Sequence, residues 1–269
     1  MSDVLYVTSF TKDIYKASGK KMIETFLKFH PNNKMVVCYE KMKLGDFEDL
    51  SHNILTYDLE KSDFLKTWLF KNRDIIPFYL GGLATVRNNL ELFKSEFNRQ
   101  ASCFFRKIVS IDYAILSYGK QYNYIVWIDA DSYFTKKIPN NTVPNVFSNS
   151  HVFFHLGTKR MNANLGIESG IIGFKKGNGY RFFKMVADKF RNGSFRKYEK
   201  WDDGYVFRKV WEEVVKINDQ NPDDCNQILF NDVVSHIVKS RRNQVIPYGP
   251  FGDFVVHEKG KHKRLHIRI

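Results

Sequence analysis

The sharpest chemical signal in the sequence is a pair of acidic residues, Asp129 and Asp131, that follows the apolar run Tyr124–Ile128. Such a run is typical of a central strand buried on both faces, and in an open α/β sheet ligands bind beyond the carboxyl ends of the strands. Alternate residues of an extended chain point the same way, so both carboxylates can face one site. Hard oxygen ligands suit a divalent cation that neutralises a diphosphate. The alternative is a chance pair of loop acids that cap a helix or face solvent.

A second group of potential ligands lies near the carboxyl terminus, where His257, Gly260 and Lys263 are spaced by three residues. A neutral imidazole binds Mn²⁺ readily, a glycine lets the backbone approach a phosphate, and a lysine supplies a compact positive charge. The alternative is a basic tail in which histidine and lysine are simply abundant. His262 is an alternative ligand to His257.

These residues need a sheet to position them, and the chain alternates strand and helix patterns. We expect strands at 4–9, 35–39, 54–57, 124–128, 151–155, 170–174, 245–247 and 254–256. We expect helices at 12–29, twice within about 60–100, between 102 and 119, and at 179–191, 203–216 and 226–239. The β-α-β-β opening favours an α/β sheet with right-handed crossovers. We therefore expect one α/β domain over 1–269, Rossmann-like, with a central, mostly parallel mixed sheet flanked by helices.

The composition is that of a globular protein with an excess of positive charge. Hydrophobic residues make up 43% and the formal net charge is +13, which favours polyanionic partners such as a nucleotide diphosphate, nucleic acid or an anionic membrane surface. Three scattered cysteines indicate neither a disulfide framework nor a zinc site. No stretch is typical of a membrane span or a signal peptide, so we expect a cytoplasmic protein, such as a bacterial or viral enzyme acting in the cytosol.

Residues 104–134, which end in Trp127-Ile128-Asp129-Ala130-Asp131, resemble the core of the glycosyltransferase A-type fold. They are similar to the retaining galactosyl-, mannosyl- and xylosyltransferases, while His257-x-x-Gly260-x-x-Lys263 resembles a pattern of glycogenin-like enzymes. The resemblance implies that Asp131 and His257 bind Mn²⁺ (or Mg²⁺) directly. Asp129 would contact the ribose or the metal and its bound water, and Gly260 and Lys263 would hold the diphosphate.

The same resemblance implies further donor and acceptor contacts. Lys107 or its neighbour Arg106 would face the donor, and the end of the first strand, Thr8, Ser9 and Phe10, would lie under the nucleotide base. The candidates for a catalytic carboxylate are Asp203, Asp202 and Glu168. The first two stand where relatives carry an acid plus Gln, and either could instead only cap the following helix. Glu168 could instead be a surface acid beside a turn.

We therefore expect a metal-dependent glycosyltransferase that moves a sugar from a UDP- or GDP-linked donor to a hydroxyl of a glycan or other acceptor. The alternatives are a metal-dependent nucleotidyltransferase or phosphohydrolase, or a basic nucleic-acid-binding protein. Against them, the first strand has no glycine-rich phosphate loop, and no nucleic-acid-binding module is recognisable. We expect no nucleic-acid partner, and the sequence leaves the donor base, the sugar, the acceptor, the stereochemistry and the oligomeric state open.

Overall fold

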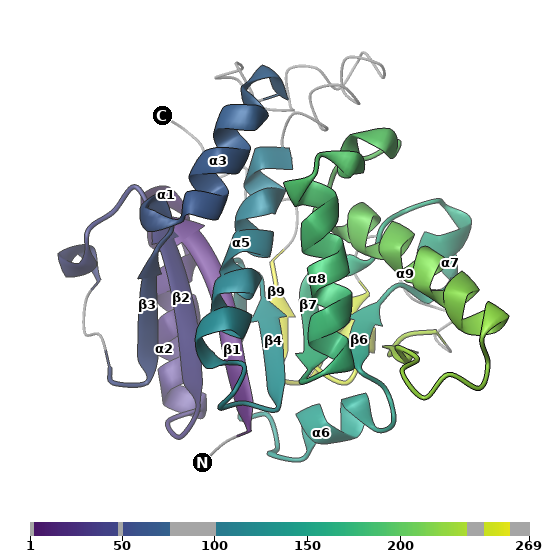
Figure 1. The fold of residues 1–269 in the computed structure, drawn as a ribbon. Helices are drawn as coiled ribbons and strands as arrows, with labels where there is room; N and C mark the ends of the chain where they lie inside the picture. Colours follow the sequence, from purple (N-terminus) through teal and green to yellow (C-terminus); the bar gives the residue numbers. More distant parts are fainter. Residues whose placement is uncertain (1–2, 48–50, 76–100, 236–244, 259–269) are drawn as a thin grey trace.

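A computed structural model of the chain describes residues 3–47, 51–75, 101–235 and 245–258 (Figure 1). Several predictions therefore fall outside the described residues. They are the roles of Gly260, His262 and Lys263, the second helix expected before residue 100, and the end of the helix expected at 226–239.

The centre of the fold is a seven-stranded sheet with the order β3-β2-β1-β4-β7-β6-β8. Of its six neighbouring pairs, four are parallel, while β7 runs antiparallel to both β4 and β6. The strands are β1 (Val4–Thr11), β2 (Lys34–Glu40), β3 (Ile54–Asp58), β4 (Tyr124–Ile128), β6 (Val152–His155), β7 (Glu168–Lys175) and β8 (Phe230–Asp232). The predicted class, an α/β fold with a mostly parallel mixed sheet, is confirmed.

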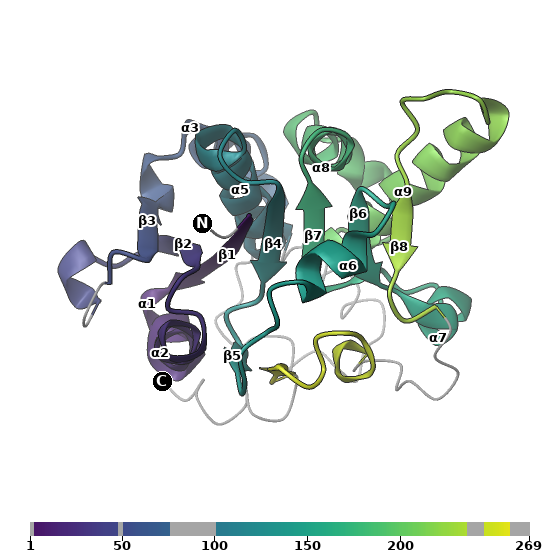
Figure 2. The ribbon, with the colours of Figure 1, turned by 90° about the horizontal axis from the view of Figure 1, so that it is seen from below.

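Helices cover both faces of this sheet (Figures 1 and 2). One face carries α3 (Asp63–Lys71), α5 (Ala101–Tyr118), α8 (Asn178–Arg191) and α9 (Asp203–Gln220). The other face carries α2 (Lys20–Phe29), which continues from α1 (Lys12–Ile14) through a π-helical turn, and α6 (Thr142–Phe147). The short helix α7 (Gly157–Asn162) precedes β7.

Side chains of the central strands alternate between two hydrophobic cores. In β4, Ile125 and Trp127 belong to the core under α5 and α8, while Val126 and Ile128 belong to the core under α2. Because the side chains of a strand alternate with a period of two, a strand covered on both sides must be apolar throughout. This requirement explains why the continuous run before Asp129 could be recognised in the sequence.

A separate two-stranded sheet lies beside α2. It pairs β5 (Ser132–Phe134) antiparallel with β9 (Val255–His257), which joins segments more than a hundred residues apart. The hydroxyl oxygen of Thr25 in α2 accepts a hydrogen bond from the backbone N–H of Phe134 at 3.1 Å. Helix α2 thus supports the strand pair through which β9 lies beside the segment that follows β4.

Two predicted elements were wrong. The segment predicted as helix 226–239 contains strand β8, because Phe230–Asp232 pairs with Val152–Phe154 at the sheet edge. The carboxylate of Asp232 also accepts the backbone N–H groups of Leu156 and Gly157 at 2.9 and 2.8 Å. The expected strand 245–247 is instead a 3-10 turn, Ile246–Tyr248, with a proline near its start. Strand β5 and helices α6 and α7 were not predicted.

No helix among the described residues is long and apolar enough to cross a membrane.

Candidate metal centre

Asp129 and Asp131 follow β4 directly, at the edge of the sheet where parallel strands β1, β2 and β4 end. The chain then turns into β5, whose Ser132 pairs with His257 of β9. The backbone N–H of Glu258 donates to the carbonyl oxygen of Asp131 at 2.9 Å. This backbone pairing brings His257 to the acidic pair from the far end of the sequence.

The three side chains form one cluster. Nε2 of His257 lies 3.1 Å from Oδ1 of Asp131 and 3.6 Å from Oδ2 of Asp129. Each residue offers one ligand atom, and these atoms lie within 4.8 Å of one another. The side chains are 5% (His257), 11% (Asp131) and 26% (Asp129) exposed, so the cluster is partly open to solvent. Two carboxylate oxygens and one imidazole nitrogen are a donor set suited to Mn²⁺ or Mg²⁺, and the Asp129-x-Asp131 pair fits a DxD motif.

Gly170 of β7 provides the space that His257 occupies. A Cβ atom on Gly170 would lie 2.5 Å from Cε1 and 2.8 Å from Nδ1 of the imidazole. The carbonyl oxygen of Gly170 also accepts the backbone N–H of Asp129 at 2.8 Å. One residue thus fixes the end of β4 and leaves room for the histidine.

Lys107 of α5 is buried behind this cluster, where it joins two carboxylates. Its Nζ lies 2.9 Å from Oδ1 of Asp129 and 2.7 Å from Oδ2 of Asp203, and it donates to the carbonyl and hydroxyl oxygens of Ser169 at 2.9 and 3.0 Å. Burial lowers the pKa of Lys107, but Asp129 and Asp203 raise it by more, so the net shift is upward. Burial and the charge of Asp131 raise the pKa of Asp129, but Lys107 and His257 together lower it by more, so this pKa lies below its ordinary value. The lysine is therefore a fixed positive charge under the acidic pair.

Asp202 and Asp203 stand at the amino terminus of α9 and have different surroundings. Asp202 is the N-cap, and its Oδ1 accepts the backbone N–H of Tyr205 at 2.9 Å. Burial, and then repulsion from Asp203, raises the pKa of Asp202 to about 6. The helix is held near the sheet by a close backbone approach at Gly204, whose carbonyl oxygen accepts the N–H of Ile167 at 2.9 Å.

The third candidate carboxylate, Glu168, begins β7 and is only 2% exposed. Its Oε2 lies 3.3 Å from a guanidinium nitrogen of Arg160 in α7. The same arginine donates through Nε to the carbonyl oxygen of Gly166 at 3.0 Å. Glu168 is therefore a buried, ion-paired group, and the alternative of a surface acid is wrong.

Of the residues expected near the donor, Thr8, Ser9 and Phe10 lie in the second half of β1, and Arg106 lies on α5. Arg106 forms an ion pair with Glu40 at the end of β2 and donates to the carbonyl oxygen of Ser102 at 2.6 Å. Thr8 is fully buried within β1, Ser9 is half-buried, and the ring of Phe10 stacks on Tyr15 at a centroid distance of 5.4 Å. Among these three residues, only Ser9 is partly open to solvent.

Two residues of the centre had no role in the sequence analysis. Trp127 donates from its indole nitrogen to Oδ1 of Asp129 at 2.7 Å, and Ser169 accepts from Lys107. The alternation of side chains in a strand could have indicated Trp127, since it lies two residues before Asp129. The sequence held no comparable signal for Ser169, because its partner lies 62 residues away.

A cavity of about 620 Å³ lies at the opposite edge of the sheet, beside the start of β1. Its lining includes Asp3, His30 and Lys137, none of which belongs to the cluster. Ligands of open α/β sheets bind beyond the carboxyl ends of the strands. We therefore locate the candidate site where β4 ends, at Asp129, and not in this cavity.

No family model matches the chain, and no curated protein matches it. Among solved structures, it is similar to a glycosyltransferase involved in the glycosylation of the major capsid of PBCV-1. The two chains are 14% identical, the match covers 98% of each, and the TM-score is 0.47. It is also similar to mouse xyloside xylosyltransferase 1 in its apo form, with 12% identity, coverage of 85% of this chain and 84% of that one, and a TM-score of 0.44. Both TM-scores are below 0.5, so we infer the activity of this chain from its own site.

Proposed function

We propose that this protein is a metal-dependent glycosyltransferase that moves a sugar from a nucleoside-diphosphate sugar to a hydroxyl group of a glycan or another acceptor. The observation that carries the proposal is the cluster of Asp129, Asp131 and His257 at the carboxyl edge of a mixed α/β sheet. A ligand that needs a divalent cation and carries negative charge fits this edge, where nucleotides bind in open α/β sheets.

The cation would be Mn²⁺ or Mg²⁺, held by the two carboxylates and the imidazole, and it would supply Lewis-acid stabilisation of the leaving diphosphate. The imidazole among the ligands favours Mn²⁺, because nitrogen ligands suit transition metals better than Mg²⁺. Lys107 keeps Asp129 ionised and in position, and Lys263 and Gly260 remain our proposal for the diphosphate contacts.

For the acceptor proton, we favour Asp202 among the three candidate carboxylates because of its protonation. Asp203 is ion-paired with Lys107, and Glu168 with Arg160, whereas the pKa of Asp202 is raised to about 6. A base with a pKa close to the working pH is the most effective. With Asp202 as the base, direct attack of the acceptor hydroxyl would invert the anomeric configuration. Transfer of the acceptor proton to the leaving phosphate instead would retain it. NMR of the transfer product distinguishes the two routes.

The test is thermal unfolding with a panel of nucleotides and nucleotide sugars, with and without MnCl₂, on the wild type and on Asp131→Ala. A ligand that binds only the native state at about 100 times its Kd stabilises the protein by about 2.7 kcal/mol. We expect one nucleotide diphosphate to raise the melting temperature only when both Mn²⁺ and Asp131 are present. The control is Asp63→Ala, which removes a carboxylate that is 97% exposed in α3.

Donor turnover completes the test, because release of free sugar or transfer to an acceptor separates glycosyl transfer from nucleotidyl transfer or phosphate hydrolysis. If no nucleotide shifts the melting temperature under any metal condition, the proposal is wrong. Salt-sensitive binding of nucleic acid without donor binding would then favour a basic nucleic-acid-binding protein.

A further inference from the structure

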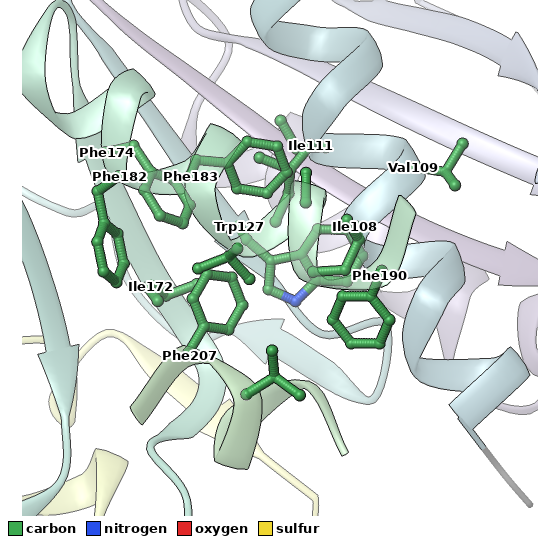
Figure 3. Close-up of a cluster of buried hydrophobic side chains, with 14 of the residues drawn as sticks. Ile108, Val109, Ile111, Trp127, Ile172, Phe174, Phe182, Phe183, Phe190 and Phe207 are labelled. Carbon is green, nitrogen blue, oxygen red and sulfur yellow. The ribbon is translucent and has the colours of Figure 1, made fainter. Parts of the chain in front are cut away.

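Trp127 is a core residue whose indole N–H reaches the candidate metal centre, while the ammonium of Lys107 lies over its ring, 5.2 Å from the ring centroid. Its ring is 2% exposed and lies in the hydrophobic core under α5 and α8, among Ile108, Ile172, Phe190 and Phe207 (Figure 3). A buried indole N–H requires an acceptor. Here the acceptor is Oδ1 of Asp129, at 2.7 Å.

The two oxygens of Asp129 consequently have different surroundings. Oδ1 receives the indole N–H and also faces Nζ of Lys107 at 2.9 Å. Oδ2 lies 3.6 Å from Nε2 of His257. Because Oδ1 is occupied by two donors on the core side, Oδ2 is the oxygen turned toward the other members of the cluster.

We propose that Trp127 is a positioning residue that fixes the carboxylate of Asp129 so that Oδ2 is the oxygen available to a divalent cation. The inference rests on the proposed cation site. The terminal torsion of an aspartate is broad, so an unsupported carboxylate rotates freely. Hydrogen bonds from the surrounding shell orient metal ligands, and their loss typically lowers metal affinity by about 10- to 100-fold.

Trp127 and Lys107 contribute differently to this arrangement. The lysine adds a positive charge next to the carboxylate, which competes with a cation, whereas the indole N–H is neutral. The packed neighbours of the ring also prevent it from following a moving carboxylate, since protein cores are dense and side chains there occupy fixed rotamers. The tryptophan therefore restricts the rotation of Asp129 without adding charge.

The experiment compares two tryptophan variants for Mn²⁺ binding. Trp127→Phe keeps an aromatic ring and removes the N–H. The matched control is Trp68→Phe, because Trp68 is also 2% exposed, belongs to the same core and donates its indole N–H to the carbonyl oxygen of Phe190 at 3.0 Å. Binding is measured with MnCl₂ alone, from the electron paramagnetic resonance signal of the free ion, and stability is measured by urea unfolding.

We expect both variants to lose stability, because each loses a buried hydrogen bond and part of a ring. We expect only Trp127→Phe to raise the Kd for Mn²⁺, by about 10- to 100-fold. If Trp127→Phe does not fold, 3-benzothienylalanine at the same position replaces the N–H by sulfur and keeps the two-ring shape, and the same rise in Kd is expected.

The outcomes separate this inference from the proposed function. If the wild type binds Mn²⁺ and the Trp127 variants bind it equally well, the positioning role is wrong and the metal site stands. If the wild type binds Mn²⁺ with the expected loss in the Trp127 variants but binds no nucleotide, the positioning role stands and the transferase proposal is wrong. A wild type that does not bind Mn²⁺ overturns the positioning role, whereas the nucleotide panel still decides the transferase proposal.

Discussion

Substitution of Gly170 by alanine tests whether the position of His257 controls cation binding. The new Cβ atom would lie 2.5 Å from Cε1 of His257, whereas ordinary contacts begin at 3.4 Å. The imidazole must therefore withdraw by about 0.9 Å to restore an ordinary contact, and the new methyl group is also crowded by Ile246 at 2.9 Å. Metal–ligand distances tolerate deviations of only about 0.2 Å. We expect Gly170→Ala to lower the affinity for Mn²⁺ about as much as His257→Ala does.

The assay is Mn²⁺ binding to Gly170→Ala, to His257→Ala and to the double variant. If the methyl group acts by displacing the imidazole, it has nothing to displace once the imidazole is gone. The two substitutions should then be strongly non-additive, with the double variant binding Mn²⁺ no more weakly than His257→Ala. Gly45→Ala is the control, because no atom lies within 4 Å of its new Cβ.

Two results would refute the reasoning. The first is unchanged Mn²⁺ affinity in Gly170→Ala, which would mean that His257 is not a ligand or that β9 moves without cost. The second is an equal loss of Mn²⁺ affinity when Gly170→Ala is made in the wild type and in His257→Ala. The methyl group would then act through Asp129, whose backbone N–H donates to the carbonyl oxygen of Gly170.

Two further predictions concern the charges around the centre. Lys107→Met removes the ammonium between Asp129 and Asp203, so we expect urea unfolding to show a loss of about 3–5 kcal/mol in the free energy of unfolding, the usual cost of leaving a buried charge unpaired. The exposed control Lys66→Met should be nearly neutral, and an equal loss in both variants would contradict the role of Lys107. Burial, and then Asp203, raises the pKa of Asp202 to about 6, so the folded state holds this proton more tightly than the unfolded chain does. The stabilisation from that proton is present below the ordinary pKa of 3.8 and is lost as the pH rises through about 6. Asp202→Asn, which still caps the helix, should therefore gain stability relative to the wild type between about pH 4 and pH 7 in urea unfolding, and a pH-independent difference would refute the assignment.

The sequence alone determined the parts of the site that depend on local patterns. A strand buried on both faces must be apolar at every position, so Tyr124–Ile128 could be recognised, and the acids after it could be located at the carboxyl end of a strand. Pattern reasoning of the same kind predicted the first three strands and the mixed α/β class. His257 was predicted as a ligand from a resemblance; its imidazole lies 3.1 Å from Asp131, and its role as a metal ligand stays a prediction.

Only the tertiary structure decided which groups meet across the chain. Lys107 was expected to face the donor, but its partners Ser169 and Asp203 lie on other elements, and no local pattern encodes these contacts. Strand β8 formed in a segment predicted as helix because an edge of the sheet was available to pair with it. His257 and Asp131 are 126 residues apart, and the β5–β9 pairing joins them. Local periodicity specifies helices and strands, but the contacts that tune a site depend on the packing of elements distant in sequence.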